Sequence, residues 1–551
     1  MVHSPVFALL LLSACNGKGS QEDAACTDDL VVSSPNQGAW VASDSVLVLG
    51  QTCTLESIQV QGQPIAVEED GSFSVTVPLA RGINTVEIVG LKGDTPVEME
   101  RLSILHGEFG EAGALLEQPI RSHISETGLD ILSGAVIGMM TPEALTTMVA
   151  ANNPLVQEPL DLGIVLDTEV HVNTVDFSGA TLDLALHDGK VGLTLQVADF
   201  HVWGTLLASH DGSLFYDETM DGYADLVVVS GYLAPGLQDG ALQLEASEVS
   251  AHLEGFGFDV SDFPDWIEEH VLDDVVREML EEIVVETLPE MLIPAMVSAF
   301  EWLTLQETVE VFDASLDLST QPVAFTVSTL GIDLSFDMAV SGAGGAHAAP
   351  HGPFLSPATE TSLAQQEDIG IGVHDDVWNS ALYELWRAGG FDMTFSTTDD
   401  SLTSMASTLL ESDNVEMGLD FVLPPVVVAG PDGLEFQFGE IVVDLQTPGG
   451  ILGETATLAI FGTMNVNATF SAGELSLEFE SIDAKAIVRE NDWSMGTLEA
   501  SEAFAQRLPL EMALGTMAGM TLPMPNLMEM GISSVTASRS GETPETVISV
   551  R

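Results

Sequence analysis

The sequence predicts an α+β chain in which β structure dominates. We expect a small β-sandwich followed by two tandem barrels of bent antiparallel sheet, wrapped on long helices and joined by a central sheet. Most of the chain alternates apolar and polar residues, which indicates strands with one buried face. A few segments instead repeat apolar residues every three to four positions, as amphipathic helices do. The order of helix and strands in the first half recurs in the second half, which indicates a structural repeat.

Length and composition favour a folded protein of several domains. The chain has 551 residues, enough for two to four domains, and its 46% hydrophobic against 18% charged residues exclude a disordered protein. Asp and Glu number 85 and Lys and Arg only 13, which gives a net charge of −72. This charge excludes nucleic acid as a partner and indicates a solubilising surface.

The N-terminus predicts export. Residues 6–12 form an apolar run that is too short to span a membrane, and they lead into the string LSAC, which ends at Cys15. The string resembles a bacterial lipobox, which implies that residues 1–14 are a lipoprotein signal peptide and that Cys15 is acylated. Asn16 favours the outer membrane by the same resemblance. A plain secretory signal is the alternative, because the segment before the apolar run lacks Lys and Arg.

The next segments are predicted to be a tether and the β-sandwich. Residues 15–29 are small, polar and acidic, and residues 30–107 alternate short β runs with turn signals. Cys26 and Cys53 form an isolated pair, which in an exported chain predicts a disulfide rather than a metal site. The string EEDGSFSVTVPLARGINTVEIVG resembles a bacterial immunoglobulin-like module, which implies a spacer.

Residues 108–305 are predicted to form the first barrel, with two helices. The apolar side of the first helix contains Leu129, Leu132, Val136 and Met140. The second helix is predicted to open at Asp262 and to stop or kink at Pro289 and Pro294. Its apolar stripe contains Val271, Val275, Met279 and Ile283.

The remainder is predicted to contain the central strands and linker, residues 306–358, and the second barrel, residues 359–551. A short strand at 369–373 leads into a helix that Asp375 caps and Gly389 ends. A closing helix is expected near 501–518. The apolar stripe of the opening helix contains Trp378, Leu382, Leu385 and Trp386.

Three strings in residues 107–551 resemble the bactericidal/permeability-increasing protein family, which has the tubular lipid-binding (TULIP) fold. VHDDVWNSALYELWRAGG resembles the opening of the second barrel, IRSHISETGLDILSGAVIGMM the first helix, and LPMPNLMEMGISSVTAS the strand that completes the second barrel. The resemblance implies a boomerang of two barrels that bind phospholipid or another acyl-chain lipid. It also implies that the helix residues named above line the lipid pockets. The chain lacks the cationic tip of the bactericidal members and a cysteine pair inside the first barrel.

No catalytic motif accompanies this pattern. The chain has no G-x-S-x-G, H-E-x-x-H or P-loop string, so we expect a lipid-binding protein of the envelope rather than an enzyme. A structural or adhesive surface lipoprotein, with the barrels as scaffold, is the alternative.

One acidic segment partly fits a calcium loop. Asp217, Thr219, Asp221 and Asp225 occupy ligand positions, with Gly at the sixth position, but Val228 stands where the loop needs Glu. The segment predicts either a weak Ca²⁺ site or an acidic hairpin turn.

Overall fold

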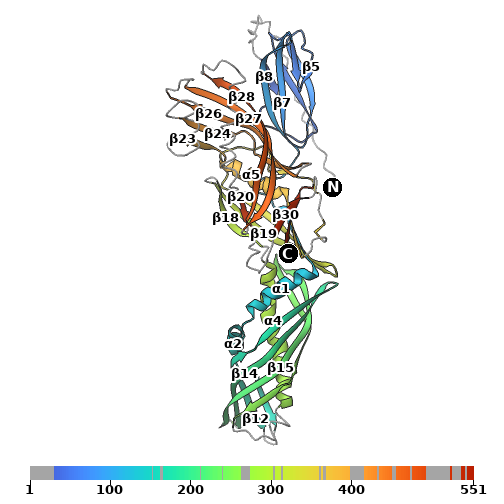
Figure 1. Ribbon diagram of the computed structural model, residues 1–551, viewed down its shortest axis with the longest axis vertical. Coiled ribbons are helices and arrows are strands. Elements are labelled where there is room, and N and C mark those ends of the chain that lie inside the picture. Colours follow the sequence, from blue (N-terminus) through green and yellow to red (C-terminus); the bar gives the residue numbers. More distant parts are fainter. Residues whose placement is uncertain are drawn as a thin grey trace, which may run out of the picture.

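The computed structural model describes residues 30–550 with gaps, the longest of which are 262–272, 397–414, 492–520 and 524–534. The predicted signal peptide, the tether and the closing helix therefore lie outside the described residues, as do Cys15 and Cys26. Cys53 is disulfide-bonded. The described chain is mostly β, with two curled sheets and few helices. It is elongated, with the first barrel at one end, the central sheet in the middle, and the sandwich beside the second half at the other end (Figure 1).

The first unit is a sandwich of two sheets. The smaller sheet has the order β1 (Val31–Ser34), β3 (Ser45–Gln51), β6 (Ser72–Pro78). The larger sheet has the order β2 (Ala39–Val41), β8 (Thr95–His106), β7 (Gly82–Lys92), β4 (Ser57–Val60), β5 (Gln63–Ile65). Alternating residues of both sheets form one buried apolar cluster, including Val48, Ile58 and Val86. The hydrophobic effect of this shared burial holds the two sheets together.

The sandwich packs against the second half of the chain. The backbone N–H of Ile83 donates to Gln437 Oε1 at 2.7 Å. The Trp40 ring lies 5.0 Å from Phe109 and 6.3 Å from Tyr383, centroid to centroid. A second apolar cluster spans the contact and contains Leu105, Phe354, Leu423 and Val426. The unit that resembles a spacer is therefore a packed part of the fold.

The first barrel is one strongly curved sheet with helices against it (Figure 1). Its main path is β11 (Val156–Asp161), β12 (Val165–Asp176), β14 (Lys190–His210), β15 (Ser213–Gln238), β16 (Ala241–Glu254). β13 (Gly179–His187) pairs with β14, and β17 (Gly257–Val260) pairs with β15. The helices are α1 (Glu126–Met139), α2 (Pro142–Ala151) and α4 (Asp273–Glu301).

The helix boundaries follow from local chemistry. Ser125 caps α1, and its hydroxyl accepts a hydrogen bond from the Gly128 N–H at 3.2 Å. The helix α4 contains Pro289 and Pro294 and continues to Glu301, so the helix does not stop at these prolines, and the alternative of a kink there stays a prediction. The part of that helix predicted from Asp262 lies outside the described residues.

The predicted calcium loop is not formed. Asp217, Thr219, Asp221 and Asp225 lie inside β15, where Asp217 pairs with Leu207 of β14 and Asp221 with Trp203. An extended strand advances about 3.3 Å per residue, so these oxygens are spread along the strand instead of surrounding one ion. The alternative prediction, an acidic hairpin turn, is also wrong, because residues 217–225 continue as one extended strand. The intervening Met220, Gly222 and Ala224 are buried, and this period-two burial indicates a strand.

The central sheet takes strands from both halves. Its order is β18 (Gln306–Val311), β19 (Ala314–Ser328), β20 (Gly331–Gly342), β10 (Leu116–Ile124), β22 (Ile369–His374), β31 (Glu545–Val550), β30 (Val535–Arg539). The antiparallel pairing of β10 with β22, such as Ser122 with Ile371, joins the strand that precedes α1 to the strand that precedes the opening helix of the second half.

The second barrel is again a curled sheet with a helix packed against it. Its helix is α5 (Asp375–Ala388), and its sheet has the order β23 (Met393–Ser396), β24 (Glu416–Phe421), β26 (Gly433–Gln446), β27 (Thr455–Ser471), β28 (Glu474–Asn491), β29 (Thr521–Pro523). β25 (Val426–Gly430) pairs with β26, and β9 (Glu108–Phe109) pairs with β21 (Phe354–Leu355). Gly389 ends α5 in the left-handed region, as expected, but His374 rather than Asp375 is the N-cap.

Among the described residues, no single helix is long and apolar enough to cross a membrane. The helices α1 and α2 together are long and apolar enough to span a membrane, by length and composition only. They are bent by 60° relative to each other.

A buried ion pair fixes the start of α5. Asp375 is fully buried, and both of its carboxylate oxygens accept hydrogen bonds from Arg539 of β30, at 2.6 and 2.7 Å. We predict that Arg539→Gln lowers the free energy of unfolding of the second half by about 3–5 kcal/mol, because it leaves a buried carboxylate unpaired. Urea unfolding followed by tryptophan fluorescence measures this. Adding Asp375→Asn should restore part of the loss, and an additive double mutant would contradict the pairing.

Candidate functional site

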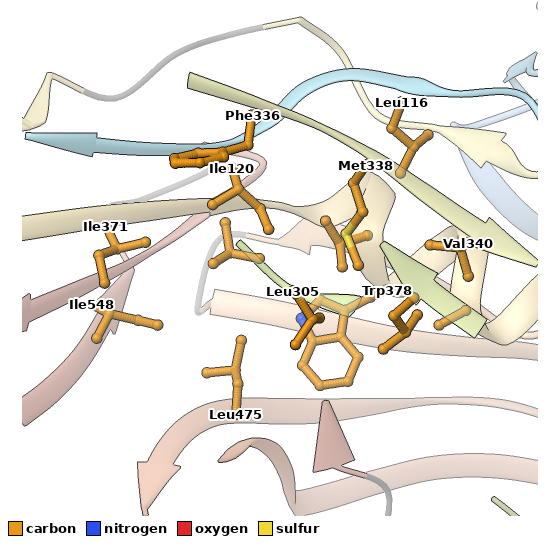
Figure 2. Packing of buried hydrophobic residues seen from close by; sticks show 14 of the residues in the cluster. Leu116, Ile120, Leu305, Phe336, Met338, Val340, Ile371, Trp378, Leu475 and Ile548 are labelled. Atoms are coloured by element: carbon orange, nitrogen blue, oxygen red, sulfur yellow. The ribbon is translucent and has the colours of Figure 1, made fainter. Parts of the chain in front are cut away.

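A single apolar cluster runs through both barrels and the central sheet. It includes side chains of α1, α4, α5 and the inner faces of the curled sheets. In Figure 2, Ile120, Phe336 and Ile371 of the central sheet lie on one side, and Leu475 of β28 lies on the other. Trp378 of α5 lies between these layers (Figure 2). The interior of the molecule is therefore apolar from one barrel to the other.

The structure places eight of the twelve predicted lipid-binding side chains in this cluster. They are Leu129, Leu132, Val136, Met140, Trp378, Leu382, Leu385 and Trp386, and all are at most 5% exposed. Val275, Met279 and Ile283 lie on α4, but the structure does not describe their side chains, and Val271 lies outside the described residues. Burial agrees with a pocket lining and with a packed core, so the lipid-binding role of these residues stays a prediction.

The helix α5 is buried on almost every face, and not on one stripe only. Polar side chains on its other faces find specific partners. Asn379 donates to the Val427 carbonyl at 3.1 Å and accepts from the Val427 N–H at 2.8 Å. Trp386 Nε1 donates to the Phe421 carbonyl at 2.6 Å, and the Tyr383 hydroxyl donates to the His351 carbonyl at 3.0 Å. These bonds hold α5 at a fixed distance from β24 and β25.

Burial also shapes the charge on α5. It raises the pKa of Glu384 above its ordinary value, although the nearby Arg387 guanidinium opposes the shift. Glu384 accepts from Arg387 Nε at 3.1 Å and from the Gly342 N–H at 3.3 Å. This carboxylate therefore ties α5 to the end of β20.

A cavity of about 320 Å³ opens where β26 and β27 meet β30 and β31. We call it the Arg539 pocket. Its lining residues are Gly433, Leu434, Val466, Asn467, Ala468, Thr469, Ala537, Ser538, Arg539 and Thr546. Leu434 and Val466 also belong to the apolar cluster, so one wall of the pocket is continuous with the interior.

Two residues that line the Arg539 pocket each carry a buried polar atom without a hydrogen-bond partner. These are Nε of Arg539 and the hydroxyl of Thr546, a residue that is 1% exposed. A buried donor without a partner costs about 1–3 kcal/mol, so a bound acceptor atom at this point would be favoured. The arrangement can therefore hold a molecule with a polar end against these groups and an apolar part along Leu434 and Val466.

Sequence reasoning missed this pocket. Its residues come from four strands, and only Ala537 and Ser538 fall in a string that the sequence analysis singled out. Arg539 carries the one usable signal, because arginine and lysine are rare in this chain.

Comparison with known proteins gives likenesses to parts of the chain and to its overall shape. Residues 28–95 match the family described as glucodextranase, domain B. The structure is similar to lipopolysaccharide binding protein, with 14% identity and a TM-score of 0.43 over 79% of this chain and 99% of that chain. It is also similar to P47 of Clostridium botulinum E1, with 8% identity and a TM-score of 0.22 over 80% and 100% of the two chains. Takeout 1 of Epiphyas postvittana has 9% identity and a TM-score of 0.16, over 29% and 87%. No curated protein sequence matches the chain.

The Asn379 contact gives a direct test of how α5 is held. We predict that Asn379→Ala destabilises the second half by about 1–3 kcal/mol for each Val427 backbone group that it leaves unpaired. Thermal unfolding, compared with the exposed control Thr536→Ala, measures the effect. An equal and small change in melting temperature in both variants would show that the Asn379 hydrogen bonds to Val427 do not stabilise the second half.

Proposed function

We propose that this protein binds acyl-chain lipids in its apolar interior and holds their polar ends at the Arg539 pocket. The observation that carries the proposal is the junction in this pocket between the apolar cluster and the unpartnered groups of Arg539 and Thr546. An acyl chain that enters the interior loses water contact, which is worth about 25 cal/mol per Å² of apolar surface. The chemistry is sequestration, with no bond made or broken.

The alternative function is a scaffold whose interior is solid core. The continuity of the Arg539 pocket with the apolar cluster supports the lipid-binding function over the scaffold. The presence or absence of bound lipid on the purified protein distinguishes the lipid-binding function from the scaffold.

We expect lipid to remain bound when the exported chain is purified, and blocking the Arg539 pocket should remove it. Ala537→Trp places a large ring in the pocket, whereas Thr536→Trp on the same strand is exposed and does not line it. Native mass spectrometry should show lipid on the wild type and on Thr536→Trp, and at least about tenfold less on Ala537→Trp at an unchanged melting temperature. A wild type without lipid, which also takes up no fluorescent fatty acid, would support the scaffold.

Thr546→Val tests the polar end of the pocket separately. Valine has nearly the shape of threonine, and the hydroxyl that it removes has no partner, so the fold should keep or gain stability. If that hydroxyl binds the lipid, affinity should fall by about 0.5–1.5 kcal/mol, the net worth of one hydrogen bond. A titration with a fluorescent phospholipid measures this, and unchanged affinity would place the polar end elsewhere.

We further propose that the protein is a lipoprotein of the bacterial outer membrane, anchored at an acylated Cys15. The LSAC string supports this proposal. Cys15→Ser should release the protein from the membrane fraction or leave it uncleaved, as judged by fractionation and intact mass. Unchanged fractionation of this variant would contradict the anchor and leave the plain secretory signal.

A further inference from the structure

A cluster of three metal-ligating side chains lies outside the proposed lipid site. It consists of His347 from the segment between β20 and β21, Asp392 from the turn before β23, and Asp420 of β24. One ligand atom from each lies within 4.8 Å of the other two. His347 Nε2 is 2.9 and 3.0 Å from the two Asp392 oxygens and 4.0 Å from Asp420 Oδ1.

The imidazole of His347 is held in one orientation. Its ring stacks on Trp386 of α5, with a centroid distance of 4.8 Å and an interplanar angle of 15°. The His347 backbone N–H also donates to the carbonyl of Arg387, at 3.3 Å. The stack and the backbone bond together point Nε2 at the two carboxylates, as a ligand nitrogen must point at its ion.

Negative charge accumulates at this point. The carboxylates of Asp392 and Asp420 each place an oxygen within 4.8 Å of the other and of the His347 ring nitrogen. A cation between the carboxylates would relieve the repulsion between them.

We propose that His347, Asp392 and Asp420 bind a divalent transition metal ion, with Zn²⁺ as the ion that suits them. One imidazole nitrogen and two carboxylate oxygens are donors of the type found on Zn²⁺, at about 2.0–2.2 Å from the ion. To reach that distance from one ion, the Asp420 carboxylate would move toward His347 Nε2 and the Asp392 carboxylate slightly away from it. Three protein donors leave a fourth tetrahedral position open to water.

The site has an entry path and a structural consequence. His347 lines a cavity of about 480 Å³, whose other lining residues include Glu111, His351, Tyr383 and Arg387. The ion would fasten the Gly-rich segment 342–357 to the end of α5 and to β24. Metal binding is therefore a clamp on this segment and is independent of lipid binding.

The test is Zn²⁺ binding by the full chain, without a histidine tag, after dialysis against a chelator. Competition with a chromogenic zinc chelator should show one Zn²⁺ equivalent on the wild type. His347→Phe keeps an aromatic ring on Trp386 and removes the nitrogen, and Asp420→Asn removes one charge from an exposed side chain. Each variant should weaken binding by at least about tenfold, because loss of outer-shell partners alone costs about 10–100-fold.

The matched control is His171→Phe. His171 lies 3.3 Å from Glu169 but belongs to no three-donor cluster among the described residues. This variant should bind Zn²⁺ as the wild type does. Zn²⁺ should also slow proteolysis in residues 342–357 of the wild type and of the control, but not of His347→Phe. A wild type that binds no Zn²⁺, or His347→Phe and Asp420→Asn variants that keep the full equivalent, would overturn the proposal.

Discussion

The fold depends on the pairing of buried carboxylates with a small number of arginines. Asp375, Glu384, Glu440 and Glu545 are the buried carboxylates of the described part of the chain. Each has an arginine partner, and the pairs are Asp375 with Arg539, Glu384 with Arg387, Glu440 with Arg489 and Glu545 with Arg121. Burying an unpaired charge costs several kcal/mol, so each partner is required where it stands. The chain has only 13 basic residues for 85 acidic ones, and four of the 13 are the arginines that pair with these buried carboxylates.

Three of these pairs join different elements, whereas Glu384 and Arg387 lie one turn apart on α5. Glu545 of β31 and Arg121 of β10 lie in strands on either side of β22 in the central sheet. Glu440 also accepts a hydrogen bond from Gln37, which ties the sandwich to the second barrel. Because an ion pair is directional and the apolar cluster is not, the pairs fix the relative positions of parts that hydrophobic burial merely brings together.

Much of the architecture can be predicted from the spacing of apolar residues. The helix α5 shows both what this spacing predicts and what it does not. Its apolar spacing and Gly389 predict its position to within one residue. Its burial on almost every face is not predictable, because the partners of Asn379 and Asp375 lie 48 and 164 residues away. The strand β15 was missed because its acidic residues, on the outer face, suggested a loop. The strand β28 has an irregular register beside Phe479, and this interrupts its alternation of apolar and polar residues.

The candidate site was predicted in part. The stripes of α1 and α5 do face the shared apolar cluster. The Arg539 pocket and the His347 cluster each contain residues from several elements that are far apart in the sequence. No spacing in the sequence predicts that such residues lie side by side. Helix periodicity identifies buried faces, but it does not separate a packed core from a lipid slot, because both need the same apolar side chains.

The most direct measurement is photo-cross-linking with a fatty acid that carries a diazirine near the end of its chain, followed by peptide mapping. The account predicts labels on inward-facing residues of the second barrel, such as Trp378 of α5 and Leu475 of β28. Labels confined to exposed positions, or no labels at all on protein that binds the probe, would contradict an interior that receives acyl chains.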